Sequence, residues 1–300
     1  MLTISFHSVK GGAGATTTLL NTLSYLGKDL NVTSKNPILV IDSDLSTSSL
    51  TYLLNLDQRF SQSYDVKSLF EGVLPGKNVV GDLSTHPFIS KCVKLGNVFN
   101  LEDDSVYFLG IDDIKDFDLG DSARSIDKVI YELKRLCRGL GFSAVIFDLE
   151  AGDDLISNLI MRNSKVIVMP LRVSSESIIS SSRFLERFES AMIDPDTDEQ
   201  LRSLIVLPNF TPKVDDMFNG INLFTESLQL LEDRLDNIKF LINRTFINSK
   251  VFGIEELTRL KWFEGILHEG LNDLSSDEKK ALERYKLLAK TIIIEGRNDS

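Results

Sequence analysis

The chain has 300 residues, with 33 basic and 44 acidic side chains, and its formal charge at pH 7 is −11. This acidic balance argues against a protein whose whole surface is made for nucleic acid or anionic lipid, although a local basic patch is compatible with it. Hydrophobic residues make up 42% and charged residues 26% of the chain, which is typical of a globular protein. No stretch approaches the roughly 18 apolar residues of a membrane span, and the first residues lack a signal-peptide pattern, so we expect a cytoplasmic protein.

Apolar runs and amphipathic stretches alternate along the chain. Residues 2–9 alternate like a strand, and after a glycine cluster the leucines of residues 16–30 recur at helical spacing. Short apolar runs typical of strands buried on both faces follow at residues 37–42, 144–148, 166–170 and 204–207. Helical stretches are expected at residues 125–138, 174–190 and 276–294. The order predicts one α/β domain over residues 1–300, with a doubly wound, mostly parallel sheet and helices on both faces.

Two parts of the chain, residues 56–120 and the last helix, are expected to depart from this simple alternation of strands and helices. Residues 56–120 are rich in polar residues and glycine, and we expect a long excursion there with one further strand, at residues 106–109. The last helix, residues 276–294, places Leu282, Tyr285 and Leu288 along one face. We expect that face to dock on the domain rather than on a membrane, because a polar tail follows the helix.

Metal binding or disulfide formation by cysteine is not indicated. Cys92 and Cys137 stand far apart and form no CxxC or mixed Cys/His cluster, and the three histidines are scattered singly. The sequence therefore predicts neither a zinc site nor a disulfide framework.

Residues that are candidates for ligand binding or catalysis follow several of the predicted strands at their carboxyl ends. They are Lys10 to Thr17 after the first strand, Asp42 and Asp44 after the second, Asp148 to Gly152 after a later one, and Pro170 after the next. Ligands of doubly wound sheets bind beyond the carboxyl ends of the strands. We therefore expect these residues to share one rim of the sheet.

The most specific motif is Lys10-Gly-Gly-Ala-Gly-Ala-Thr-Thr17, between a strand and a helix. Glycines let backbone N–H groups converge on an anion, and the helix N-terminus adds partial positive charge, so the motif predicts a phosphate site. A glycine-rich turn without a ligand is the alternative. A dinucleotide fingerprint fits less well because Thr17 stands in place of its third glycine, and the ordinary P-loop pattern fails at Val9 and Ala15.

The motif resembles that of the ParA/MinD ATPases, whose deviant P-loop reads K-G-G-x-G-K-[ST]. Lys10 to Gly14 and Thr16 match this pattern, and Ala15 does not. In this respect the loop resembles those of the TadZ/CpaE branch, which often carry alanine at this place. Electron transfer of the nitrogenase iron protein kind is not expected, because no cysteine follows the later Asp148 strand.

The resemblance covers nearly the whole chain. Residues 38–44 are similar to the family's second acidic motif, and residues 144–148 to its Walker B strand, although Glu150 and Ala151 replace a frequent Pro-Pro. Residues 166–177 look like the strand, proline and loop after Walker B. Residues 206–209 look like the strand whose asparagine reads adenine.

The resemblance implies ATP and Mg²⁺ as cofactors and a homodimer that sandwiches ATP. Gly11, Gly12, Ala13, Gly14, Ala15, Thr16 and Thr17 would then hold the phosphates, and Pro170 and Asn209 would contact the base. Lys10 would reach the phosphates of the partner subunit, and Asp44 would orient the attacking water. Thr16, Asp42 and Asp148 would bind Mg²⁺. For the strand-end carboxylates the alternative is a solvated loop or a helix cap.

Ala15 occupies the place of a lysine that normally contacts the β- and γ-phosphates. Losing one such contact costs roughly 1.5 to 3 kcal/mol of binding, and the rate of hydrolysis is expected to suffer more. Two functions remain open at this point. One is a nucleotide-switched ATPase that positions or segregates a cargo, with weak or partner-dependent hydrolysis. The other is a catalytically inactive scaffold that localises a pilus or secretion machine.

Nonspecific DNA is a weakly supported further partner. Six basic residues between positions 234 and 261 are interleaved with acidic ones, which favours a solvated face over a DNA-binding patch. They are Arg234, Lys239, Arg244, Lys250, Arg259 and Lys261.

Overall fold

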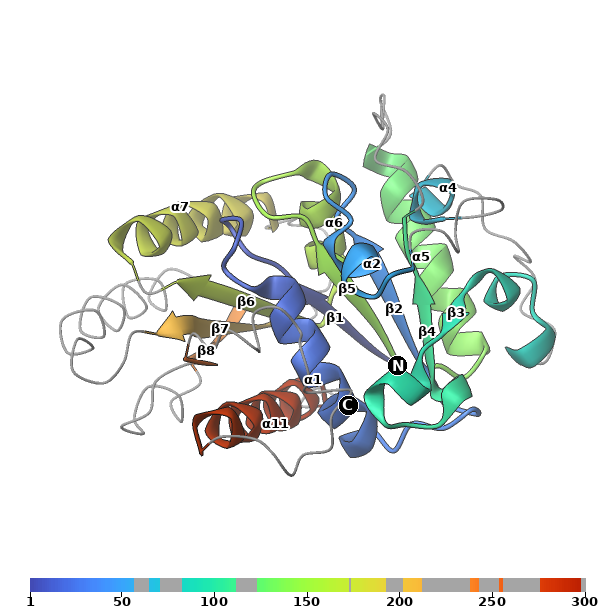
Figure 1. Cartoon of the computed structure of the whole chain (residues 1–300). Coiled ribbons are helices and arrows are strands. Elements are labelled where there is room, and N and C mark those ends of the chain that lie inside the picture. Colours follow the sequence, from blue (N-terminus) through green and yellow to red (C-terminus); the bar gives the residue numbers. More distant parts are fainter. Residues whose placement is uncertain are drawn as a thin grey trace. The chain divides into compact units, whose positions relative to one another are not determined.

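A computed structural model describes residues 1–56, 65–70, 83–111, 123–172, 174–192, 202–211, 238–242, 254–255 and 276–297. Strands and helices alternate along these residues (Figure 1). The chain groups into two compact units. The first comprises Met1–Ser5, Leu26–Glu150 and Asp154–Ser164, and the second comprises Phe6–Tyr25, Ala151–Asp153 and Lys165–Ser300.

Strands of the first unit lie in the order β3-β4-β2-β5-β1. They span β1 Leu2–Phe6, β2 Ile38–Ser43, β3 Val93–Lys94, β4 Val106–Leu109 and β5 Ala144–Leu149. Strand β2 is parallel to both β4 and β5, whereas the two-residue β3 is antiparallel to β4. The helices are α2 Ser49–Leu53, α4 Val66–Phe70, α5 Ala123–Gly139 and α6 Leu155–Asn163. Helix α6 packs against α5.

The excursion at residues 56–120 differs from the expectation of a single strand. Its described part contains the predicted β4 and also β3, joined by short 3₁₀ turns at Gly96–Phe99 and Asp103–Ser105. Strand β3 is too short to show a periodic pattern in the sequence, and it forms because Lys94 and Val93 pair with Tyr107 and Phe108.

The second unit is built on parallel strands in the order β6-β7-β8, with β9 also pairing with β7. Its elements are α1 Ala15–Asp29, β6 Val166–Arg172, α7 Ser175–Met192, β7 Arg202–Thr211, β8 Ile238–Ile242, β9 Ile254–Glu255 and α11 Ser276–Arg297. Helices α7 and α11 lie on opposite faces of these strands (Figure 1). This is the doubly wound arrangement expected from the sequence.

Burial explains why the central strands were recognisable in the sequence. Every residue of β2 and β5 is buried, and in β6 only the last residue, Arg172, is exposed. Strands covered on both faces read as continuous apolar runs. Because the polar residues of β2 and β5 stand near their carboxyl ends, both strands bring buried carboxylates to the same edge.

Helix α11 buries the apolar face that the sequence predicts. Leu282, Tyr285 and Leu288 are at most 7% exposed. The hydroxyl of Ser203 on β7 also donates to Glu295 of α11, with 3.1 Å between the oxygens. The helix therefore docks on β6 and β7, and its apolar stripe is covered by the second unit itself.

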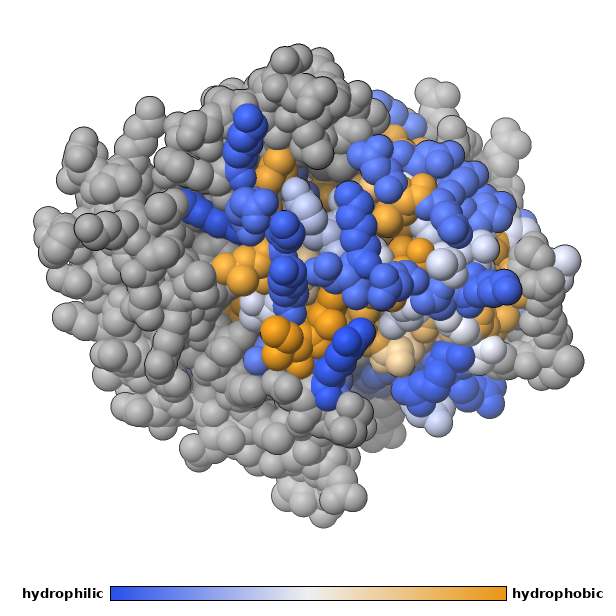
Figure 2. Space-filling model, turned by 90° about the horizontal axis from the view of Figure 1, so that it is seen from below, coloured by the Kyte–Doolittle hydropathy of each residue, from blue (hydrophilic) through white to orange (hydrophobic). Residues whose placement is uncertain are grey.

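Among the residues that the structure describes, the large apolar side chains that remain exposed come from several elements. They are Tyr52 and Leu53 of α2, Tyr131 of α5, Leu155 of α6, Ile179 of α7 and Ile294 of α11. On the face shown in Figure 2, apolar residues are interspersed with hydrophilic ones. Single exposed apolar residues are normal for a folded protein surface. Among the helices that the structure describes, none has the length and apolarity needed to cross a bilayer.

Candidate functional site

The glycine-rich loop begins with a tight turn. The backbone N–H of Ala13 donates to the carbonyl of Lys10 across 3.4 Å, and Gly12, the third residue of the turn, has a φ of 74°. Gly14 has a φ of 89° and immediately precedes α1, where Thr18 N–H donates to its carbonyl at 2.9 Å. Side chains with a Cβ rarely adopt positive φ, so these two glycines allow the path of the loop.

The loop leads directly into a long helix. Ala15 opens α1 and is 7% exposed, while Thr16 and Thr17 are half-buried in its first turn. A glycine loop that ends at a helix N-terminus presents backbone N–H groups and the positive end of the helix dipole to an anion. The local geometry therefore fits a phosphate group.

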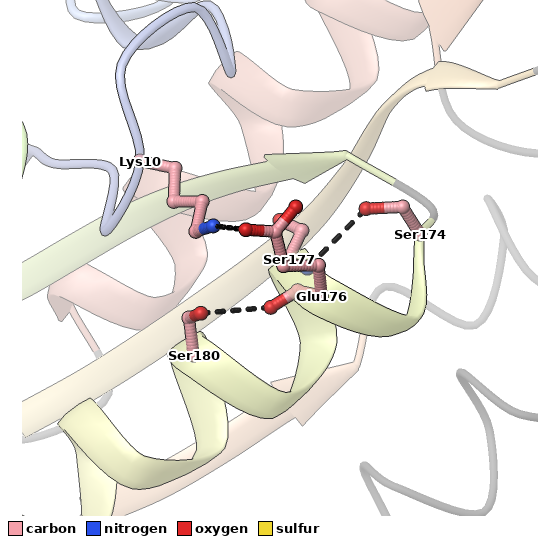
Figure 3. A network of polar contacts seen from close by, with 5 residues as sticks. All are labelled: Lys10, Ser174, Glu176, Ser177 and Ser180. Atoms are coloured by element: carbon pink, nitrogen blue, oxygen red, sulfur yellow. Dashed lines mark hydrogen bonds and ion pairs between the residues drawn. The ribbon is translucent and has the colours of Figure 1, made fainter.

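Lys10, at the start of this loop, forms an ion pair with Glu176 (Figure 3). Both side chains are open to solvent, with relative exposures of 40% for Lys10 and 80% for Glu176. The hydrogen bond from Lys10 lowers the pKa of Glu176 below its usual value. Within the second unit, the cation of the loop is therefore held by a carboxylate from the first turn of α7.

The start of α7 is fixed by its own serines. The hydroxyl of Ser174 accepts a hydrogen bond from the N–H of Ser177 at 3.2 Å, which is the arrangement of a helix N-cap (Figure 3). Ser180 donates to the carbonyl of Glu176 at 2.8 Å. Glu176 lies in the first turn of the helix, where a negative charge is favourable. The carboxylate that meets Lys10 is thus placed by a capped helix.

A second cation contacts the loop from the end of β6. The Nε of Arg172 donates to the carbonyl of Gly12 with a distance of 3.1 Å. A Cβ built on Gly12 would lie 3.7 Å from Nη2 of the same guanidinium. Arg172 is exposed, and its own carbonyl accepts from the N–H of Ser174 at 2.9 Å. The Lys10–Glu176 ion pair and the Arg172–Gly12 hydrogen bond therefore both link the glycine-rich loop to the segment from the end of β6 to the start of α7.

Residues 151–153 also touch the segment before the loop. Gly152, with a φ of 117°, donates its N–H to the carbonyl of Ser8 at 3.0 Å. Asp153 pairs with Arg187 of α7 at 3.0 Å. The segment after the Asp148 strand therefore supports the entrance of the glycine loop within the second unit.

The first unit contains the carboxylates predicted to bind metal. Asp42 on β2 and Asp148 on β5 are partners in the parallel register, and both are fully buried. Burying carboxylates is costly unless they are hydrogen-bonded or bind a cation. A divalent cation bound between two neighbouring carboxylates would compensate their buried negative charge.

Asp42 also accepts hydrogen bonds from residues of the first unit. One carboxylate oxygen accepts from the N–H and the hydroxyl of Thr51, at 2.8 and 2.6 Å, and the other accepts from the N–H of Asp44 at 3.3 Å. Burial raises the pKa of Asp42 to about 7, an effect that the hydrogen bonds from Thr51 reduce and the nearby charge of Asp44 adds to. Asp42 thus also anchors α2 to the end of β2.

The carboxylate of Asp44 organises the loop between β2 and α2. It accepts hydrogen bonds from the N–H and hydroxyl of Thr47, the former at 2.9 Å, from Ser46 at 3.1 Å and from Ser49 at 3.3 Å. These contacts stabilise the turn before α2, whose N-cap residue is Ser48, so Asp44 has a structural role in its loop. A carboxylate has about four acceptor sites, and these four hydrogen bonds occupy them in the structure.

Glu150 follows β5, where the resemblance leads one to expect proline. Partial burial raises the pKa of its carboxyl group, and the charges of Asp154 and Asp44 raise it further, while a hydrogen bond from Ser46 lowers it. Glu150 therefore lies with Asp44 in the same acidic region of the first unit.

The sequence-predicted residues fall in two groups. Lys10 to Thr17 and Pro170 lie in the second unit, and Asp42, Asp44 and Asp148 lie in the first. Asn209 is on β7 in register with Arg172, one residue after the pair Leu171 and Pro208. Of the basic residues between 234 and 261, only Lys239, in β8, lies within the described residues.

Sequence analysis missed four residues of these two groups: Thr51, Glu150, Arg172 and Glu176. Arg172 could have been found, because it ends a predicted strand on the edge where ligands bind. Glu150 stands out in the sequence only as a departure from a frequent proline. Thr51 and Glu176 have no local signal, since each depends on a contact made elsewhere in the chain.

Metal binding by protein groups alone is not indicated. Over the residues that the structure describes, no group of three or more His, Cys, Asp or Glu side chains lies close enough to hold an ion. Mg²⁺ is usually held by one or two carboxylates together with phosphates of the substrate. The pair Asp42 and Asp148 fits that second mode.

Comparisons with known proteins identify the architecture. McdA from Cyanothece is 18% identical, with a TM-score of 0.60 over 98% of this chain and 99% of that one. MinD from Aquifex aeolicus is 18% identical, with a TM-score of 0.58 over 98% and 97% of the two chains. ParA of pNOB8, solved on nonspecific DNA, is 14% identical, with a TM-score of 0.59 over 100% and 99%.

The chain has the fold of the ParA/MinD ATPases. The fold class expected from the sequence is thereby confirmed: a doubly wound, mostly parallel α/β fold of the P-loop NTPase kind. Solved structures with this fold include an ATP complex of McdA from Cyanothece and an Mg-ADP complex of MinD from Pyrococcus horikoshii. No family model matches the chain. No curated protein matches it either.

Proposed function

We propose that this chain is a cytoplasmic ATP-binding protein in which the nucleotide controls a homodimer that positions or segregates a cargo. The observation that carries the proposal is the loop of positive-φ glycines, Gly12 and Gly14, at the N-terminus of α1. The ParA/MinD fold supports it, because proteins of this fold include partition and positioning ATPases and have been solved with ATP and with Mg-ADP.

In this proposal the loop from Gly11 to Thr17 binds the triphosphate through its backbone. Thr16, Asp42 and Asp148 bind Mg²⁺, and Asp44 orients the attacking water. Pro170 and Asn209 contact the adenine. When it is bound, Mg²⁺ neutralises charge on the phosphates and so favours attack by water.

Lys10 has the role of crossing to the partner subunit of the dimer. Two triphosphates facing each other need compensating positive charge, which a lysine at this position supplies. Because Ala15 provides no cation to the β- and γ-phosphates, hydrolysis is slow or depends on a partner protein that contributes one.

Isothermal titration calorimetry with Mg-ATP tests the proposal directly. We expect saturable binding by the wild-type chain. Asp44→Ala should trap a dimer in ATP, and Lys10→Ala should abolish that dimer, as measured by sedimentation. A wild-type chain that binds no purine triphosphate in the presence of Mg²⁺ would refute the proposal.

A catalytically inactive scaffold that localises a pilus or secretion machine is the second candidate. Two observations favour it: Ala15 lacks the usual cation, and Lys10 is paired with Glu176 of the same chain. Phosphate release stimulated by a partner favours the switched ATPase. Dimerisation without nucleotide, together with no turnover, favours the scaffold.

Nonspecific DNA binding is a separate part of the proposal. ParA of pNOB8 has been solved on nonspecific DNA with this fold. If the basic residues between positions 234 and 261 bind DNA, the chain should retain DNA at low salt and lose it at moderate salt. A mobility-shift assay at two ionic strengths tests this without any variant.

A further inference from the structure

Helix α5, Ala123–Gly139, exposes a face that the proposed function does not use. We propose that this face is a docking surface for a short acidic segment of a partner protein. It consists of Lys128, Tyr131, Arg135 and Arg138, which together form the α5 stripe. All four belong to the first unit, and docking there goes beyond the proposed function because it does not depend on a nucleotide.

The α5 stripe exists because the helix is amphipathic. Its buried side chains recur every three or four residues and are at most 6% exposed; they are Ile126, Val129, Ile130, Leu133, Leu136 and Cys137. The four residues of the stripe have the same spacing on the opposite side, and all of them are exposed. This spacing places successive side chains one above the other along one face of a helix.

The charge of the α5 stripe is opposite to that of the whole chain. The chain has a formal charge of −11, whereas the exposed residues of α5 from Ile126 onward are three cations, a tyrosine and Gly139. The two acidic residues of this part of the helix, Asp127 and Glu132, are half-buried. Asp127 accepts a hydrogen bond from the side-chain amide of Asn163 in α6 at 3.0 Å. The exposed positions of this part of α5 therefore carry positive charge alone.

A cation used for packing looks different on this helix. Lys134 is half-buried, and its ammonium group donates to the carbonyl of Asn163 at 2.8 Å. Over the part of the chain that the structure describes, the side chains of Lys128, Arg135 and Arg138 form no such hydrogen bond and no ion pair. Their charges therefore face solvent and can meet the carboxylates of a partner.

Tyr131 distinguishes the α5 stripe from a simple basic face. It is 66% exposed, the highest value among the large apolar residues that the structure describes, and it lies one helical turn from both Lys128 and Arg135. A single exposed aromatic residue is common on folded proteins. Tyrosine beside arginine, however, is the composition that supplies most of the binding energy in protein interfaces. A docked segment would meet Tyr131 with an apolar side chain and the cations with carboxylates.

The length of the α5 stripe favours a short segment over a long polyanion. Ten positions separate Lys128 from Arg138, which is about 15 Å of helix at roughly 1.5 Å per residue. An extended peptide covers that length with about five residues. DNA carries its charge over a much longer distance and would also meet the negative field of the rest of the chain. Charge complementarity therefore favours an acidic peptide segment.

Fluorescence anisotropy with the full chain at low salt tests the proposal. The probe is a fluorescein-labelled peptide, Glu-Glu-Leu-Glu-Glu-Leu-Glu-Glu, and the same peptide with Gln in place of every Glu is the control ligand. We expect saturable binding of the acidic peptide and at least about tenfold weaker binding of the Gln peptide. No saturable binding of the acidic peptide by wild type, or equal binding of the two peptides, would overturn the proposal.

Two variants of the α5 stripe should weaken this binding. In Arg135→Glu/Arg138→Glu we expect the affinity for the acidic peptide to fall by at least about tenfold, because two attractions become repulsions. Tyr131→Ala should lower it by about fivefold, since an aromatic contact is lost. Wild-type affinity in the charge-reversed variant would refute the assignment of the surface. Thermal melts check that the exposed substitutions leave the fold intact.

Arg183→Glu/Lys290→Glu is the matched control. It reverses two exposed cations of α7 and α11 and changes the net charge of the chain equally. We expect it to bind the acidic peptide within about twofold of wild type. An equal loss in both charge-reversed variants would mean that the peptide responds only to net charge, which would overturn the proposal.

Other occupants of the α5 stripe would give different results. Tighter binding of a 20-base-pair DNA duplex than of the acidic peptide, lost in Arg135→Glu/Arg138→Glu, would replace the acidic segment by nucleic acid. Flotation with phosphatidylserine vesicles that is lost in the same variant, without peptide binding, would assign the surface to a membrane. Peptide binding by a wild-type chain that binds no ATP would refute the proposed function and leave this inference standing.

Discussion

The ammonium group of Lys10 pairs with the carboxylate of Glu176, 166 residues later in the chain. In the proposed dimer Lys10 reaches the phosphates of the partner subunit, so this ion pair has to open before the dimer can close. The structure therefore holds the residue proposed to join two subunits against α7 of its own chain.

Removing the carboxylate should favour the dimer. In Glu176→Gln we expect ATP-dependent dimerisation to strengthen modestly, by less than about fivefold, because ion pairs between exposed side chains contribute little. Sedimentation velocity at several protein concentrations in Mg-ATP measures this change.

Glu283→Gln is the matched control for that experiment. Glu283 is an exposed carboxylate on α11 that pairs with Lys286 at 3.6 Å, so its loss removes the same charge away from Lys10. Equal dimerisation of Glu176→Gln and wild type, or strengthening in both variants, would contradict a restraining role for Glu176.

Adding a cation to the loop should raise turnover. In Ala15→Lys we expect phosphate release at least about tenfold faster, because one donor aimed at the developing charge commonly changes rates by 10² to 10³. Ala15→Met has a side chain of similar length without the charge, and should not speed the reaction. A rate for Ala15→Lys that is unchanged or lower would count against the account given for Ala15.

The stability of the metal-free protein should depend on pH through Asp42. Burial raises the pKa of Asp42 from 3.8 to about 7, so the folded chain holds this proton more tightly than the unfolded chain does. The resulting stabilisation is complete below about pH 3.8 and is lost as the pH rises through about 7. Stability should therefore fall in this window.

Urea unfolding of wild type and Asp42→Asn in EDTA isolates that effect. Between pH 5 and pH 8 we expect wild type to lose roughly 2 to 3 kcal/mol of unfolding free energy relative to Asp42→Asn. Asparagine cannot ionise, so the difference between the two curves reports Asp42 alone. Parallel curves across this range would show that Asp42 does not titrate there.

Thr51 should be important for stability although it was not predicted to be a site residue. Its hydroxyl donates to Asp42 at 2.6 Å and accepts from Ile111 N–H at 3.2 Å, all in buried surroundings. Thr51→Val leaves both partners without this hydroxyl and should cost roughly 1 to 3 kcal/mol in urea unfolding. Thr51→Ser keeps the hydroxyl and should cost less than Thr51→Val; the reverse order would argue against these hydrogen bonds.

The parts of the fold that could be predicted are those set by local burial. Strands β2, β5 and β6 are covered on both faces, so their sequences are continuous apolar runs. Helix α6 was missed, although Asp154 caps it by accepting from Ser157 N–H at 2.8 Å and Ile156, Leu159 and Ile160 have helical spacing. Its nine residues are too few for a strong periodic signal.

The site could be predicted where it is local and not where it depends on distant contacts. The glycines after β1 indicate a phosphate loop, because the tolerance of positive φ is a property of glycine itself and can be read from the sequence. The environment of Asp42 depends on Thr51, which lies in the unpredicted five-residue helix α2. Arg172 and Gly12 are 160 residues apart, and no pattern in the sequence joins them.

The two compact units interleave along the chain. The polypeptide passes from one to the other after Ser5, Tyr25, Glu150, Asp153 and Ser164. No single cut therefore releases either whole unit as a continuous fragment. Dissecting this protein into separately expressed halves is consequently a poor route to its activities, and point substitutions in the intact polypeptide are the appropriate tool.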